Sequence, residues 1–276
     1  MHDFRQVDVF GSGPLTGNPV AVVHDADDLD DDAMQQLAQW TNLSETTFLL
    51  RPTTDRADYR LRIFTPSREL PFAGHPTLGS AHAWLEAGGS ATDTEVVQEC
   101  GAGLVTIERG PRLAFQAPPL LRDGPVDDGD LDRVTVALGL RRDDVVDAKW
   151  VDNGPGWVGV LLRDARTVLA LEPDPVKIGE MDIGVIAPWR AGDPGHPGDA
   201  DAEVRAFDRS TEDPVTGSLN ASLGQWLAGT VLPEEYVAAQ GTAIGRRGRV
   251  HVRREGAAVW VGGNTVTTLR GEAAIR

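Results

Sequence analysis

Cysteine is almost absent from this chain of 276 residues, which contains only Cys100. A single cysteine cannot form a disulfide within the chain, and zinc sites built from cysteine pairs are excluded. Long apolar runs are also missing: no stretch approaches the 18 or so residues of a membrane helix, and no apolar segment follows a basic N-terminus. We expect a soluble, cytoplasmic protein without membrane partners, in which Cys100 is a buried structural thiol.

Positive charge is the second scarcity. Lys and Arg together number 26 against 42 Asp and Glu, which gives a net charge of −16. A field of this sign repels nucleic acid and anionic lipid, so neither is an expected partner. The acidity fits either GC-rich coding or salt adaptation, and it does not indicate a function. Apolar residues make up 41% of the chain, enough to fill the core of one large or two medium domains.

Motifs for metals and cofactors are missing as well. The six histidines show no metal-ligand spacing, and we interpret His82 as a packed or surface side chain rather than a ligand. The acidic run 25–32 lacks the Gly and the closing Glu of a calcium loop, so we interpret it as the solvated entrance of a helix at 31–40. The glycines at 11, 13 and 17 precede neither GK[ST] nor a complete GxGxxG, which makes them turn glycines. We expect no metal and no cofactor.

Residues 65–86 (TPSRELPFAGHPTLGSAHAWLE) carry the first functional signal. The pattern predicts an extended segment, a tight turn and a helix that is apolar nearly all round and therefore buried. Because Pro76 is tolerated at a first helical position, we expect Gly74 or His75 to be the cap. Open backbone donors and the positive helix end beside an imidazole predict one wall of a site for a small anion.

The second half of the chain repeats this pattern at 211–229, where GSLNASLGQWL again begins with small residues and contains a Trp. Strand-like segments precede and follow both helices, which predicts a duplicated domain. We expect domains at 1–121, completed by 264–276, and at 122–263, with a linker formed by Pro118, Pro119 and the acidic stretch 122–130. If the two helix starts face one cleft, the N–H groups of Gly74 and Gly217, with Ser218 as N-cap, would stabilise a carboxylate or an enolate-like oxyanion.

An ordered set of motifs spans nearly the whole chain: VDVF, TGNPVAVV, NLSETTF, RIFTPSRELPFAGHPTLGSA, EDPVTGS, GRRGRV and VWVGGN. This set resembles the phenazine biosynthesis isomerase (PhzF-like) family. The resemblance implies an α+β, diaminopimelate epimerase-like fold, in which two similar domains each roll a mostly antiparallel sheet around a central helix. It also implies an active site between the domains and a homodimer.

The resemblance assigns roles residue by residue. Glu45 in NLSETTF falls on the family's catalytic acid/base, and His75 in AGHPT falls on the histidine of the first motif. Asp213 and Ser218 in EDPVTGS fall on positions that hold the substrate and assist proton transfer, while Gly74 and Gly217 fall on the turn glycines. Taken alone, Glu45 would be a surface carboxylate, His75 a cap and Asp213 an ordinary turn residue.

The resemblance also implies a reaction. In the phenazine enzyme a proton moves from C3 to C1 of trans-2,3-dihydro-3-hydroxyanthranilate, which one positioned carboxylate can achieve. We expect a cofactor-independent isomerase of secondary metabolism that moves a proton between carbons of a small, anionic, unsaturated or cyclic amino or hydroxy acid. An unsaturated pyrroline or alkylproline antibiotic precursor is an alternative substrate. A non-catalytic binder of small acids is the alternative from another class. Diaminopimelate epimerases and proline racemases need a cysteine in each half, which this chain lacks.

Overall fold

The computed structural model describes residues 1–91, 94–208 and 211–275, and it divides the chain into two compact units. Unit 1 contains Met1–Gln116 and Gly262–Arg276, and unit 2 contains Ala117–Val261. The first boundary lies earlier than the expected residue 121, because the amide of Ala117 already donates to the carbonyl of Val259 within unit 2. No helix in the described ranges is both long and apolar enough to cross a membrane.

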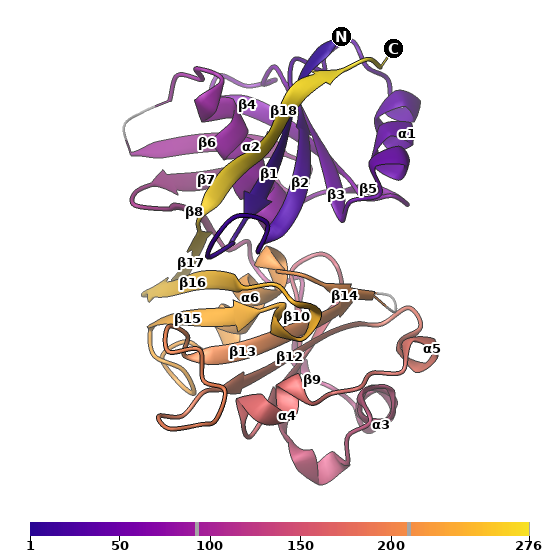
Figure 1. Ribbon diagram of the computed structural model, residues 1–276, viewed down its shortest axis with the longest axis vertical. Coiled ribbons are helices and arrows are strands. Elements are labelled where there is room, and N and C mark those ends of the chain that lie inside the picture. The colour runs from indigo at the N-terminus through magenta and orange to yellow at the C-terminus, as the bar shows by residue number, and fades with distance from the viewer. Residues whose placement is uncertain (92–93, 209–210, 276) are drawn as a thin grey trace. The chain divides into compact units, whose positions relative to one another are not determined.

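Unit 1 is a sheet wrapped around one helix (Figure 1). Its helices are α1 (Asp31–Thr41) and α2 (Gly74–Glu86). Its strands are β1 (His2–Val9), β2 (Asn18–Val23), β3 (Glu45–Leu50), β4 (Tyr59–Phe64), β5 (Glu69–Leu70), β6 (Glu95–Cys100), β7 (Gly103–Arg109), β8 (Leu113–Gln116) and β18 (Thr265–Ala273). Strand β18 from the C-terminus pairs with β1, so both chain ends belong to this unit.

The expected buried helix is confirmed: nine residues of α2 are buried, from Gly74 through Ala83. Helix α2 packs against β1, β2 and β3, and Gly79 faces the valines of β1 and β2. A Cβ at Gly79 would lie 2.3 Å from Cγ1 of Val20, so a larger residue has no room there. His82, on the same helix, contacts the hydroxyls of Thr265 and Thr267, which confirms it as a packed side chain.

Unit 2 contains α3 (Asp128–Leu138), α4 (Ala165–Leu169), α5 (Pro175–Ile178) and α6 (Gly217–Leu227). Its strands are β9 (Arg122–Pro125), β10 (Val145–Asp152), β11 (Trp157–Leu162), β12 (Asp182–Pro188), β13 (Ala202–Asp208), β14 (Thr211–Asp213), β15 (Glu235–Gln240), β16 (Gly248–Glu255) and β17 (Ala258–Gly263), the last of which crosses the unit boundary. Of the predicted linker, Pro118 and Pro119 lie outside any helix or strand. Its second part, 122–130, is wrong, because this segment forms β9, paired with β10, and the start of α3.

The pairing pattern of unit 1 recurs in unit 2. In unit 1, β1–β2 is antiparallel, β2–β3 parallel, β3–β4 antiparallel and β4–β6 parallel. In unit 2, β10–β11, β11–β12, β12–β13 and β13–β15 follow the same order of directions. A short strand, β5 or β14, leads into the buried helix in each case. The chain therefore has the duplicated α+β architecture expected from its sequence.

Unit 2 buries a carboxyl group that no motif indicated. Glu203, on β13, is fully buried, and the indole nitrogen of Trp189 donates to its Oε2 at 3.2 Å. Burial in an apolar environment disfavours the charged form and raises the pKa of Glu203 to about 7. The folded protein therefore keeps this proton between about pH 4.5 and 7, where the unfolded chain loses it.

The raised pKa of Glu203 predicts that the stability of the protein depends on pH. Because the folded pKa is the higher one, the free energy of unfolding should fall as pH rises through this window. Replacement of Glu203 with Gln removes that loss. Urea denaturation at pH 5 and pH 8 measures the free energy of unfolding, and the difference between the variant and the wild type should shift in favour of the variant by about 2 to 3 kcal/mol at pH 8. The matched control is Glu180→Gln, at an exposed position, which should gain nothing. A Glu203→Gln advantage that is equal at both pH values would contradict the prediction.

Candidate active site

The structure brings three polar side chains of unit 1 together at the starts of three elements. Asn18 is the first residue of β2, Glu45 is the first residue of β3, and His75 is the second residue of α2. Strands β2 and β3 are parallel neighbours, so their N-terminal ends lie at the same end of the sheet. Two of the residues that the sequence singled out, Glu45 and His75, therefore meet within one unit.

The contact between Glu45 and His75 is close and dry. Nε2 of His75 lies 3.3 Å from Oε2 of Glu45, and both atoms are inaccessible to solvent. Burial lowers the pKa of His75 to about 3, although the neighbouring Pro19 backbone opposes the shift. The imidazole is therefore neutral at physiological pH and carries one proton. A neutral imidazole beside a carboxylate can hold a substrate heteroatom or share a proton with it.

The start of α2 differs in detail from the expectation. Ala73 is the N-cap, so Gly74 and His75 are the first two helical residues and Pro76 is the third. Proline is still accommodated, because the amides of the first helical turn have no partner within the helix. The amides at the start of the helix and its positive end thus lie beside the Glu45–His75 pair, as an anion site requires.

The turn between β14 and α6 supplies the polar residues of unit 2. Oδ2 of Asp213 accepts a 2.5 Å hydrogen bond from the hydroxyl of Thr216. Gln240, which is fully buried, accepts from the amide of Thr216 and donates to both the Asp213 carbonyl and the Thr216 hydroxyl. Asn220 donates to Gln240 and completes this network. Asp213 is therefore held on a rigid turn with its carboxylate orientated by a neighbour.

Ser218 is not the N-cap that the sequence suggested. Thr216 occupies the cap position, and Gly217 and Ser218 are the first two residues of α6. The Ser218 hydroxyl accepts from the indole nitrogen of Trp157 at 3.3 Å, and its carbonyl accepts from Asn153 at 2.9 Å. Ser218 thus takes the same helical position in α6 that His75 takes in α2.

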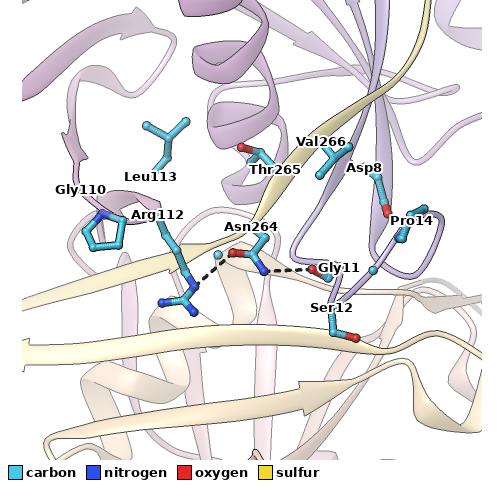
Figure 2. A pocket seen from close by; sticks show the side chains of 13 residues that line it. Asp8, Gly11, Ser12, Pro14, Gly110, Arg112, Leu113, Asn264, Thr265 and Val266 are labelled. Atoms are coloured by element: carbon cyan, nitrogen blue, oxygen red, sulfur yellow. Dashed lines mark hydrogen bonds between the residues drawn. The ribbon is translucent and has the colours of Figure 1, made fainter.

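A separate cavity of about 430 Å³ lies within unit 1, at the loops that precede β2 and β8 and at the start of β18 (Figure 2). Asn264 crosses it, accepting from Nε of Arg112 at 3.2 Å and donating to the carbonyl of Gly11. Asp8, which also lines it, accepts from the amides of Thr16 and Gly17. These bonds fix the loop that leads into β2 and Asn18, and this loop contains Gly13 and Gly17.

Sequence reasoning missed several residues near the starts of α2 and α6. Asn18 lies inside the TGNPVAVV motif but was given no role, and Thr216 lies inside EDPVTGS. Trp157 and Gln240 carry no local signal, since only the folded chain brings them to the start of α6. Cys100 is half-buried, and burial raises the pKa of its thiol, which fits the structural role expected for it. Throughout the part of the chain that the structure describes, no three His, Cys, Asp or Glu side chains gather as a metal site.

Comparisons with known proteins identify a family and relatives that are similar to this chain. The family model described as phenazine biosynthesis-like protein (PhzC-PhzF) matches residues 7–274. Trans-2,3-dihydro-3-hydroxyanthranilate isomerase of Pseudomonas aeruginosa is 37% identical over 99% of both chains. Antisense-enhancing sequence 1 of Schizosaccharomyces pombe is 36% identical, also over 99% of both chains. A PhzF-family crystal structure from Enterococcus faecalis superimposes with a TM-score of 0.79 at 25% identity, over 99% of this chain and 98% of that one.

The fold and the relatives define an isomerase with a two-domain, epimerase-like architecture. Within that class, the chain belongs to the phenazine biosynthesis-like PhzC-PhzF family.

Proposed function

We propose that the protein is a cofactor-independent isomerase that moves a proton between two carbons of a small cyclic or unsaturated amino or hydroxy acid in secondary metabolism. The proposed first substrate is trans-2,3-dihydro-3-hydroxyanthranilate, the compound named for the Pseudomonas aeruginosa relative. The observation that carries the proposal is the half-buried Glu45 carboxylate, whose inaccessible Oε2 lies 3.3 Å from a neutral His75 at the start of a helix.

Glu45 acts as the base and then as the acid. Its carboxylate takes a proton from one carbon, and the C–H bonding pair remains in the substrate as a delocalised anion. The protonated carboxyl group, whose proton exchanges with solvent before the second step, then donates a proton to a second carbon, so no electron acceptor or co-reactant is needed. His75 orients a heteroatom of the substrate, and the amides at Gly74 stabilise the transient negative charge.

Asp213, Gly217 and Ser218 supply the corresponding functions from unit 2. The Asp213 carboxylate, orientated by Thr216, accepts from a donor group of the substrate such as an amine or hydroxyl. The amides at the start of α6, together with Ser218, bind its carboxylate. Their role is supported by the repeat of the helix start in unit 2 and by the motif match, which extends over both units.

Solvent deuterium exchange tests the proposal. The protein is incubated in D₂O with trans-2,3-dihydro-3-hydroxyanthranilate, and in parallel with a panel of cyclic amino and hydroxy acids that includes pyrroline and alkylproline compounds. Mass spectrometry should show a gain of about one mass unit at a carbon-bound position. Exchange only in a pyrroline or alkylproline would move the substrate to the alternative class. Binding of these acids without exchange in any of them would favour a non-catalytic binder and refute the isomerase.

A further inference from the structure

Gln240, on β15, is fully buried, and all four hydrogen-bonding positions of its side chain are occupied. Its Oε1 accepts from the amide of Thr216 at 3.0 Å and from Nδ2 of Asn220 at 2.8 Å. Its Nε2 donates to the carbonyl of Asp213 at 3.2 Å and to the hydroxyl of Thr216 at 2.9 Å. A side-chain amide has two donor hydrogens and two acceptor lone pairs, so no further bond is open to it.

Two backbone groups fix which way round this amide lies. The N–H of Thr216 can only donate and the carbonyl of Asp213 can only accept, so the oxygen of Gln240 faces the first and its nitrogen faces the second. The nitrogen directs its remaining hydrogen at Oγ1 of Thr216. Because an amide nitrogen does not accept, the hydroxyl sends its one proton to Oδ2 of Asp213, 2.5 Å away.

We propose that Gln240 is a positioning residue that makes the Thr216 hydroxyl a donor to Asp213 and thereby holds this carboxylate as an acceptor at the start of α6. A hydroxyl that donates to a carboxyl group stabilises its ionised form. Without Gln240, the hydroxyl is free to rotate towards another acceptor, and Asp213 loses this support. The inference rests on the proposed role of Asp213, which is to accept from a donor group of the substrate.

The backbone around Gln240 holds its side chain in this position. Gln240 pairs with Val204 on β13 and with Gly248 on β16, so its strand is fixed on both sides. The next residue, Gly241, has a φ of 83°, and a Cβ there would lie 2.5 Å from the carbonyl oxygen of Pro214. No larger residue fits at this approach, which keeps the end of β15 against the turn before α6.

The corresponding glutamine of unit 1 shows what the contacts of Gln240 add. Gln98, on β6, is also fully buried, and it donates to the hydroxyl of Thr77, the fourth residue of α2. Gln240 likewise contacts Asn220, the fourth residue of α6. The cap of α2 is Ala73, which has no hydroxyl, whereas Gln240 also reaches the cap hydroxyl of its own helix. A buried glutamine therefore braces the helix in both units, and in unit 2 it is connected to the candidate site as well.

Neutron diffraction of crystals exchanged into D₂O locates the hydroxyl deuteron of Thr216 directly. In the wild type this deuteron should lie between Oγ1 of Thr216 and Oδ2 of Asp213, and one amide deuteron of Gln240 should point at the same Oγ1. A hydroxyl deuteron directed at Gln240, or an amide of the opposite orientation, overturns the proposal. This measurement needs no substrate, so its result is independent of the proposed reaction.

Gln240→Met keeps the length of the side chain but can neither donate nor accept. With trans-2,3-dihydro-3-hydroxyanthranilate, KM should rise about tenfold while kcat stays within about threefold, because binding depends on Asp213 and proton transfer on Glu45. Thr216→Val, which removes the hydroxyl and keeps the shape, should raise KM to the same extent, and Thr216→Ser should keep it near the wild-type value. The matched control is Gln98→Met, which should change neither constant.

The double variant Gln240→Met, Thr216→Val separates a positioning role from a purely structural one. If Gln240 acts through the Thr216 hydroxyl, the double variant should have the KM of Thr216→Val alone. Two losses that multiply overturn the proposal. Gln240→Glu serves if the methionine variant does not fold: it offers the hydroxyl a second carboxylate, so the deuteron should leave Asp213 and KM should rise.

The two measurements also separate this inference from the proposed function. If no acid is turned over, the proposed function fails, while the neutron result still decides which way the Thr216 hydroxyl points. If the deuteron lies as expected but KM is unchanged in Gln240→Met, the positioning role of Gln240 fails, while the isomerase activity stands.

Discussion

Replacement of Glu45 with Gln is expected to lower the turnover of the exchanging substrate by at least about 1,000-fold. Gln keeps the size of the side chain and its contact with His75, but it cannot accept a proton from carbon. Because Glu45 is the first residue of β3 and does not fill the core, folding should be unaffected. Single-turnover kinetics and deuterium exchange measure the loss, and thermal unfolding verifies that the variant is folded.

The control for this change is Glu272→Gln, which removes an exposed carboxylate from β18 of the same unit and should leave the rate unchanged. Substrate affinity of the Glu45 variant should remain within a few-fold of the wild type, since the charge-stabilising amides are intact. Turnover above a tenth of the wild-type value in Glu45→Gln would show that another group moves the proton.

Glu212→Gln should give the largest loss of stability, about 3 kcal/mol in the free energy of unfolding. Arg205 and Glu212 form a buried, two-contact ion pair at 2.7 and 3.0 Å, and Arg205 also donates to the carbonyl of Leu171. Without the carboxylate, the guanidinium remains buried and uncompensated. The pair clamps β14 to β13 immediately before Asp213, so the change also loosens the turn of the candidate site.

Urea denaturation at pH 7 measures this effect, with the exposed Arg141–Asp144 pair as its counterpart. Asp144→Asn should leave the unfolding midpoint within error, because solvent screens an exposed pair. The double variant Arg205→Met, Glu212→Leu should recover most of the loss, since it leaves no buried charge. A Glu212→Gln variant as stable as Asp144→Asn would show that the buried pair does not stabilise unit 2.

Local patterns predicted the elements whose signal lies within a few residues. Helical periodicity predicted α1 and the two small-residue helices, all of which are confirmed. Helices α4 and α5 were missed, because they have only five and four residues and too few turns to show a period. The C-terminal strand β18 was also missed, since most of its residues are exposed and its pairing partner lies at the other end of the chain.

The sequence by itself determined the family and the duplication, and it singled out Glu45, His75 and Asp213 as candidates, because ordered motifs and helix-start patterns are properties of adjacent residues. Only the tertiary structure decided that Glu45 and His75 lie 3.3 Å apart, that the imidazole is neutral, that Asn18 lies beside His75 in unit 1, and that Gln240 binds the amide of Thr216 in unit 2. These facts depend on strand pairing and on burial among residues distant along the chain. Such contacts leave no period or spacing that a single sequence could reveal.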